Sequence, residues 1–193
     1  MNMIIHDDGH TNVVASDGLL PIGDIAAMTW NRGFLEPFDF IITNPPFGST
    51  IRQTEHAYLS LYSLSERGVD WLNPKSKAAQ RPGVSSEVLF IEQCWHFLAE
   101  GGYLAIVIPD GILTNASMQY VRNWLMEKYR VLAVISLPQT TFMSTGAGVK
   151  SSVLFLRKRS AKASQRIRDA KLSLQSGIAK KGRLVERLSE IEK

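Results

Sequence analysis

The sequence has few of the features that would place a protein outside the cell or in a membrane. Among its 193 residues there is one cysteine, Cys94, so no internal disulfide can form, and its apolar neighbours predict a buried thiol in a reducing compartment. No apolar run approaches the roughly 20 residues that a membrane-spanning helix needs. Residues 1–8 have neither the basic region nor the long apolar region of a signal peptide. We therefore expect a cytoplasmic protein.

Positive charge is scarce over most of the chain. The net charge is +4, but the stretch from Arg157 onward holds twelve Lys and Arg against four Asp and Glu, and the preceding part holds ten against fourteen. The preceding part therefore lacks the basic surface of a stand-alone DNA-binding domain. The basic tail fits two roles equally well. It contacts phosphates, or it is a solvated helix face that packs on a partner.

Apolar residues alternate between short strand-like runs and longer helical patterns. Strands are expected over residues 12–16, 38–43, 103–108, 131–137 and 152–157. Helices are expected over residues 56–66, 86–100, 117–129 and 161–193, the last with breaks near Gly177 and Gly182. This order predicts an α/β fold with a mostly parallel sheet covered by helices. The final two strands lack a crossover helix and are expected to pair antiparallel at one edge.

The most informative segment is the strand of residues 38–43 followed by Asn44-Pro45-Pro46-Phe47-Gly48. The strand has little alternation, which predicts a buried parallel strand. A Pro-Pro pair ends the ladder because neither residue has an N–H, so the chain leaves the sheet in a stiff turn. Ligands of open α/β sheets bind at this carboxyl edge. The turn offers an amide, backbone carbonyls and a flat ring, which suit a planar group that bears an exocyclic amine.

Four segments, in order, resemble the N6-adenine DNA methyltransferases, and in particular the methylation subunits of type I restriction-modification systems. One of them is the turn just described. A segment before the turn contains Asn2-Met3, His6, Gly9 and residues 15–19. A helix, a strand and a turn follow at residues 97–113. The last segment is a closing hairpin, which includes residues 135–142, Gly146, residues 149–152 and residues 154–158. The resemblance covers residues 1–158, and residues 159–193 form the basic helical tail. It implies a Rossmann-like, S-adenosylmethionine-dependent methyltransferase fold.

The resemblance also implies the roles of individual residues. The catalytic residues would be Asn44, Pro45, Pro46 and Phe47. A flipped adenine would stack on Phe47, while the Asn44 side-chain oxygen and the Pro45 carbonyl accept hydrogen bonds from N6 and direct its lone pair at the methyl group. Residues binding the cofactor S-adenosylmethionine would be Asp17, Gly18 and Asn44, with Asp17 accepting from its adenine amino group. The partners would be double-stranded DNA and the specificity and restriction subunits of the complex.

One departure from the family pattern concerns the methyl donor. The family's glycine-rich cofactor loop and the acidic residue that holds the ribose have no counterpart here. The family's sheet order would place two further strands between residues 12–16 and 38–43, a gap of roughly 14 Å at about 4.8 Å per strand spacing. We therefore expect a C-terminal part of a larger enzyme with an incomplete sheet, which binds the cofactor poorly alone and is inactive alone.

Simpler interpretations accompany several of these residues. Asp17 fits an ordinary solvated turn, and Glu87 fits either a general base or an acidic residue that favours a helix N-terminus. Asp110 is expected to line the pocket at a turn. The segment from His6 to His10 fits a polar helix end better than a metal site, and no metal is expected. Two readings of the whole chain stay open: a cytosine-N4 or protein-glutamine methyltransferase, and a non-catalytic module that binds DNA or a partner.

Overall fold

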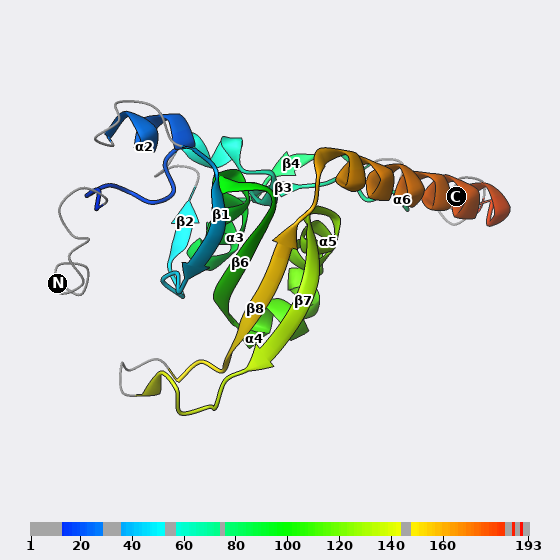
Figure 1. Ribbon diagram of the computed structural model, residues 1–193. Helices are drawn as coiled ribbons and strands as arrows, with labels where there is room; N and C mark the ends of the chain where they lie inside the picture. Colours follow the sequence, from blue (N-terminus) through cyan, green and yellow to red (C-terminus); the bar gives the residue numbers. More distant parts are fainter. Residues whose placement is uncertain are drawn as a thin grey trace.

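The centre of the molecule is a four-stranded sheet in the order β1-β6-β8-β7 (Figure 1). The computed structural model describes residues 13–28, 36–52, 57–73, 76–143, 148–183, 187 and 190. The strands are β1 (Phe38–Thr43), β6 (Leu98–Pro109), β7 (Tyr129–Ser136) and β8 (Ser151–Lys158). The strand prediction is confirmed for all four, with β6 longer at both ends than expected.

Three of the four strands run in the same direction. β1 pairs parallel with β6, while β8 lies between β6 and β7 and is antiparallel to both. The expected antiparallel pairing of the last two strands is therefore confirmed. Because β1 and β6 are parallel, the turn after β1 and the end of β6 lie at the same edge of the sheet.

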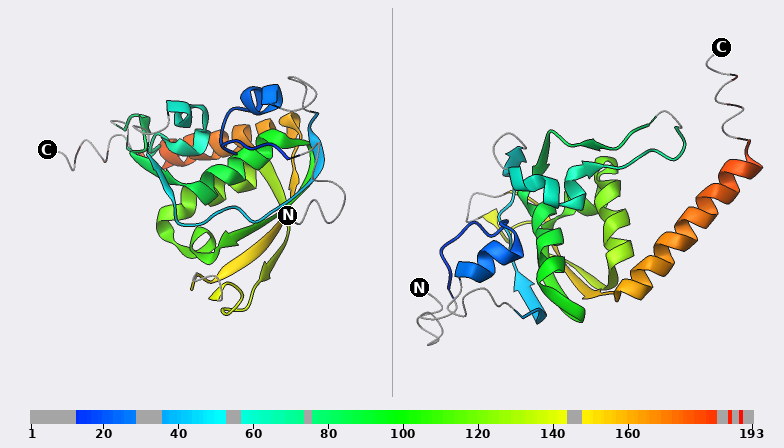
Figure 2. Two further views of the ribbon diagram at one scale, coloured as in Figure 1. Left: turned by 90° about the vertical axis from the view of Figure 1, so that its left-hand side faces the viewer. Right: turned by 90° about the horizontal axis from the view of Figure 1, so that it is seen from above.

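Helices cover one face of the sheet. α3 (Ser86–Phe97) and α5 (Gln119–Lys128) pack on it, and the short α4 (Asp110–Thr114) and a 3₁₀ turn (Ala116–Met118) lead from β6 into α5 (Figures 1 and 2). Alternate residues of β6 face these helices, and the core they form includes Val88, Leu89, Ile91, Leu104, Ile106, Ile108, Val121, Leu125, Leu154 and Leu156. Alternation places every second side chain of a strand on the same face.

Smaller elements surround this body. α2 (Ile22–Met28) precedes β1, and two short antiparallel pairs follow it: β2 (Thr50–Arg52) with β5 (Gly83–Ser85), and β3 (Glu66–Arg67) with β4 (Ala79–Gln80). α6 (Ala161–Lys181) projects away from the sheet (Figures 1 and 2). Among the described residues, no helix combines the length and the apolar character needed to cross a membrane.

Two sequence-based elements differ from the structure. The strand predicted over residues 12–16 is wrong for the part that is described, because residues 13–16 belong to no strand. The helix predicted over residues 56–66 is replaced by two 3₁₀ turns, Ala57–Leu61 and Ser63–Ser65. The physical reason is that the N–H groups of Ser63 and Leu64 donate to the Glu92 carboxylate, at 2.9 and 2.8 Å, and so cannot continue a helix ladder.

Helix ends and the burial of β1 also differ from expectation. α3 ends at Phe97 rather than at the glycine pair, and α6 continues through Gly177 and ends at Lys181, immediately before Gly182. The prediction that β1 is buried is wrong, because Phe40 is 70% exposed and Ile42 87% exposed. β1 lies at the edge of the sheet, and their side chains lie on the face opposite the helices, so no described element covers them.

Candidate functional site

The predicted catalytic turn lies where β1 ends, at the edge of the sheet where β6 also ends. Thr43, the last residue of β1, is in register with Ile106 of β6, three residues before that strand ends. Within the turn, Asn44 and Pro46 are exposed, Phe47 is half-buried and Pro45 is buried. The buried Pro45 anchors the turn, while the Asn44 amide and the Phe47 ring remain accessible to a ligand.

The first residues of α3 bind this turn through hydrogen bonds. The Ser86 hydroxyl donates to the Pro46 carbonyl at 3.0 Å, and the Gly48 N–H donates to the Glu87 carboxylate at 3.3 Å. The Ser86 N–H donates to the Ser49 carbonyl at 2.8 Å. Glu87 is only 8% exposed. Its carboxylate is thus held against the backbone of the turn, which gives it a structural contact that neither sequence interpretation of Glu87 included.

A second aromatic ring lies beside Phe47. Phe142, in the segment that joins β7 to β8, has its ring centroid 6.3 Å from that of Phe47, and the two ring planes meet at 85°. Edge-to-face contacts of this kind are favourable for aromatic pairs. No role was predicted for Phe142 from the sequence. The available signal was an aromatic residue within a Thr-, Ser- and Gly-rich segment, where no core position requires one.

The residues predicted to hold the cofactor line a pocket next to the turn. Its volume is about 340 Å³, and Asp17, Gly18 and Thr43 lie in its wall, together with Val14, Ser16, Ile25, Phe38, Ile41, Phe90, Gln93, Cys94 and Phe97. Two of the predicted cofactor residues, Asp17 and Gly18, therefore lie in the same pocket wall as Thr43, the residue immediately before Asn44. Asn44 itself is not part of the wall.

Gly18 and Asp17 are held in a tight turn against α3. The Leu19 N–H donates to the Asp17 carboxylate at 2.9 Å, and the Gln93 amide donates to the carbonyls of Gly18 and Leu20 at 3.0 and 2.8 Å. A Cβ on Gly18 would lie 3.2 Å from the Phe90 ring. A side chain at this position would therefore crowd the pocket wall.

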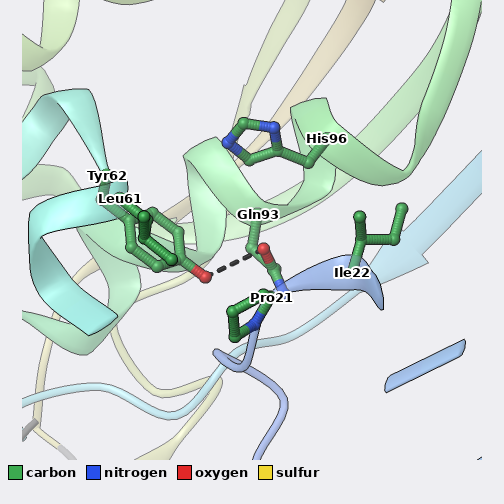
Figure 3. A pocket seen from close by; sticks show the side chains of 6 residues that line it. All are labelled: Pro21, Ile22, Leu61, Tyr62, Gln93 and His96. Atoms are coloured by element: carbon green, nitrogen blue, oxygen red, sulfur yellow. Dashed lines mark hydrogen bonds between the residues drawn. The ribbon is translucent and has the colours of Figure 1, made fainter. Parts of the chain in front are cut away.

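Gln93 is also part of a buried polar cluster. Tyr62 donates from its hydroxyl to the Leu19 carbonyl at 2.7 Å, and a 2.8 Å bond joins it to the Gln93 side chain (Figure 3). A smaller pocket of about 170 Å³ opens beside these residues and His96. Burial lowers the pKa of His96, opposed in part by Glu92. α3 thus holds both candidate regions, the turn at its start and the Asp17 segment near its end.

Other residues singled out in the sequence have structural contacts. Asp110 accepts from the Ser152 hydroxyl at 2.7 Å and so ties the end of β6 to β8. Cys94 is buried as predicted, and burial raises the pKa of its thiol to about 12. Among the described residues no cluster has the composition of a metal site. The segment from His6 to His10 lies outside the described residues.

The parallel strand, the proline-stiffened turn at its carboxyl end and the adjoining pocket lie together at one edge of a methyltransferase-like α/β fold. The chain belongs to the N-6 DNA Methylase family, whose model matches residues 1–189. Membership agrees with the resemblance carried by the Asn44 turn and its flanking segments.

Individual relatives agree with the family assignment. The chain is 26% identical over 166 residues to the type I restriction enzyme MpnII methylase subunit of Mycoplasma pneumoniae, covering 82% of this chain and 27% of that protein. It is 28% identical over 124 residues to the EcoEI methylase subunit of Escherichia coli, covering 64% and 21%. The chain therefore spans about a quarter of the length of these curated relatives.

A solved structure shows the same fold. The EcoKI M protein, from Escherichia coli strain K12, superposes with a TM-score of 0.53 at 22% identity, over 84% of this chain and 28% of that one. At this identity the similarity supports the fold alone.

Proposed function

We propose that this chain carries the base-holding part of the active site of a DNA methyltransferase that acts on adenine N6. The observation that supports it most directly is the placement of Asn44, Pro45 and Phe47 at the carboxyl edge of β1, in a chain that belongs to the N-6 DNA Methylase family. The methylase subunits among the relatives make a type I restriction-modification complex the setting for this activity.

Each group in the turn has a distinct role in this proposal. The exposed Asn44 amide oxygen and the Pro45 carbonyl accept the two N6 protons of an extruded adenine, and the half-buried Phe47 ring stacks on the base. These acceptors draw the nitrogen lone pair out of conjugation. The contribution is positioning and electrostatic stabilisation, since no strong base is required.

The methyl donor is S-adenosylmethionine, which supplies an electrophilic methyl group bound to a sulfonium. The pocket beside Thr43 fits its adenosine end, because the wall is mostly apolar and aromatic and Asp17 provides an acceptor for an exocyclic amine. The lack of a side chain at Gly18 lets the Phe90 ring lie directly against this part of the wall, since an added Cβ would be 3.2 Å from that ring. Asn44, the first residue of the turn, directly follows the pocket residue Thr43, and in this proposal it contacts the cofactor as well as the base.

The remaining partners follow from the same setting. Double-stranded DNA with a flipped adenine is the substrate, and the specificity and restriction subunits of a type I complex are the protein partners, in the cytoplasm. α6 offers a basic, solvent-exposed surface for either DNA phosphates or a partner subunit.

Nucleoside analysis of a purified complex tests the proposal. The full chain is isolated from its own cells with its associated subunits, incubated with DNA and isotopically methyl-labelled S-adenosylmethionine, and the DNA is digested for mass spectrometry. Label in N6-methyladenine is expected, and it should be lost in Asn44→Ala. Label in N4-methylcytosine, or equal labelling by Asn44→Ala, would contradict the proposal.

A further inference from the structure

Phe47 lies between two peptide groups that are both bonded to the start of α3. On its N-terminal side, the Pro46 carbonyl accepts from the Ser86 hydroxyl at 3.0 Å. On its C-terminal side, the Gly48 N–H donates to the Glu87 carboxylate at 3.3 Å. These are the two peptide planes that determine the direction in which the Phe47 side chain leaves the backbone.

The rest of the turn leaves little other freedom. Proline rings restrict the backbone φ of Pro45 and Pro46, and Gly48 has φ +83°, a left-handed conformation that suits glycine. After Gly48 the chain enters β2, where Thr50 pairs with Ser85, the residue immediately before α3. The backbone torsions of Phe47 are not restricted by a proline ring, and the bonds from Ser86 and Glu87 to the peptide groups on its two sides restrict them.

Burial supports a specific role for this pair of residues. Ser86 is 3% exposed and Glu87 8% exposed, and their side-chain oxygens lie 3.4 Å apart. A buried carboxylate is costly unless it is hydrogen-bonded. The Ser86 and Glu87 side chains bond to the turn and to each other, so a buried acid contacts the backbone of the predicted catalytic turn.

A second buried glutamate on the same helix shows the contrast. Glu92 is 3% exposed and accepts from the Ser63 N–H, the Ser63 hydroxyl and the Leu64 N–H, at 2.9, 2.7 and 2.8 Å. It therefore secures the two 3₁₀ turns. Glu92 stabilises the fold without contacting the Asn44 turn.

We propose that Ser86 and Glu87 are positioning residues that hold the Phe47 ring in the orientation needed to stack on the target base. The inference rests on the proposed function for the use of the ring, whereas the orientation of the ring can be measured independently. The Phe142 ring, in the segment between β7 and β8, packs edge-to-face with the Phe47 ring and limits its movement further.

The experiment reports on the ring directly. The full chain is prepared with 4-fluorophenylalanine at position 47, and its ¹⁹F spectrum is compared with those of Ser86→Ala and Glu87→Met, which remove one tether each. Glu87→Gln is the rescue variant, since its amide oxygen still accepts from the Gly48 N–H. Glu92→Gln is the matched control, a buried glutamate one and a half turns further along α3. Thermal unfolding of every variant establishes that it is folded.

One narrow resonance is expected for the parent chain, Glu87→Gln and Glu92→Gln, and a broadened or split resonance for Ser86→Ala and Glu87→Met. A single narrow line at the parent's chemical shift in folded Ser86→Ala and Glu87→Met would overturn the inference. If Glu87→Met does not fold, Ser86→Ala decides the result, because it removes only a hydroxyl group.

A binding assay separates this inference from the proposed function. A single-stranded oligonucleotide with one 2-aminopurine is titrated into the same variants and into Phe47→Ala. Binding about 5- to 10-fold weaker is expected for Ser86→Ala and Glu87→Met. This change corresponds to the net contribution of about one hydrogen bond. Equal binding by the parent chain and Phe47→Ala would contradict the proposed function, while the ¹⁹F result would still decide the positioning inference.

Discussion

The two faces of the central sheet differ sharply in what covers them. On the face toward α3 and α5, Leu104, Ile106 and Leu156 are almost completely buried. On the other face, Phe40 is 70% exposed and Ile42 87% exposed, and Phe155 and Tyr103 are also exposed. The two faces are similarly apolar in sequence, so hydrophobicity alone does not show which one is buried. The candidate site lies at the carboxyl end of β1, the edge strand that has one face toward the helices and the other exposed.

The largest expected effect concerns Cys94, which lies on the covered side in α3. Burial raises the pKa of its thiol from 9.0 to about 12. At pH 8 this lowers the thiolate fraction about a thousandfold, and the thiolate is the reactive form. Labelling by iodoacetamide should therefore be about a thousandfold slower in the native chain than in urea.

The sign of the linked pH dependence follows from the same shift. A folded-state pKa above the unfolded value means that the native state keeps its proton when the unfolded state loses it. The contribution of Cys94 to stability is therefore complete below about pH 9 and declines as the pH rises toward 12. Rapid labelling of the native chain at pH 8 would contradict the buried position of Cys94.

A cavity on the covered face should be the most destabilising single change. Ile106→Ala removes a fully buried side chain from β6. Such substitutions cost about 2–5 kcal/mol of unfolding free energy, because the surrounding core relaxes only partly. Urea unfolding followed by circular dichroism measures the loss. A cost below that of an exposed substitution would show that the covered face is not the core.

An intermediate effect is expected where a buried polar contact supports the covering layer. Glu92→Gln replaces one accepting oxygen by an amide that faces N–H donors, which leaves a buried group poorly paired. The expected cost is about 1–3 kcal/mol. The same denaturation experiment measures it, and an unchanged midpoint would indicate that the 3₁₀ turns are held by other contacts.

The smallest effect is expected on the open face. Ile42→Ser alters a residue that is 87% exposed in β1, and exposed substitutions usually change stability by less than about 0.5 kcal/mol. Urea titrations of Ile42→Ser and Ile106→Ala under the same conditions compare the loss of unfolding free energy on the two faces of the sheet. A loss comparable to that of Ile106→Ala would mean that the open face is covered in solution, for example by self-association, which sedimentation would detect.

Much of the sheet could be predicted because its strands carry strong local signals. Residues 38–43 became β1 with the predicted bounds, and the closing pair formed β7 and β8 in the expected antiparallel arrangement. The segment before Ser63 could not be predicted in this way. Its helical pattern is overridden by Glu92, which is distant in sequence and takes up the N–H groups that a helix would need.

The turn of the candidate site could be predicted from the sequence, but the residues that hold the turn in place could not. Asn44, Pro45, Pro46 and Phe47 form a local motif whose backbone chemistry is visible in the sequence. The contacts from Glu87 and Phe142 join residues separated by many positions, and they depend on how α3 and the β7–β8 segment are placed. The burial of β1 was misjudged for a similar reason, since position within the sheet is not a local property.

The most direct test of the central claim, that the turn after β1 holds the target base, locates a bound base on the chain. The full chain is irradiated with an oligonucleotide that carries a single 5-iodouracil in place of the target adenine, and the crosslinked peptide is identified by mass spectrometry. The account predicts an adduct on Phe47 or on its neighbour Phe142. Adducts confined to the basic residues of α6 would contradict it.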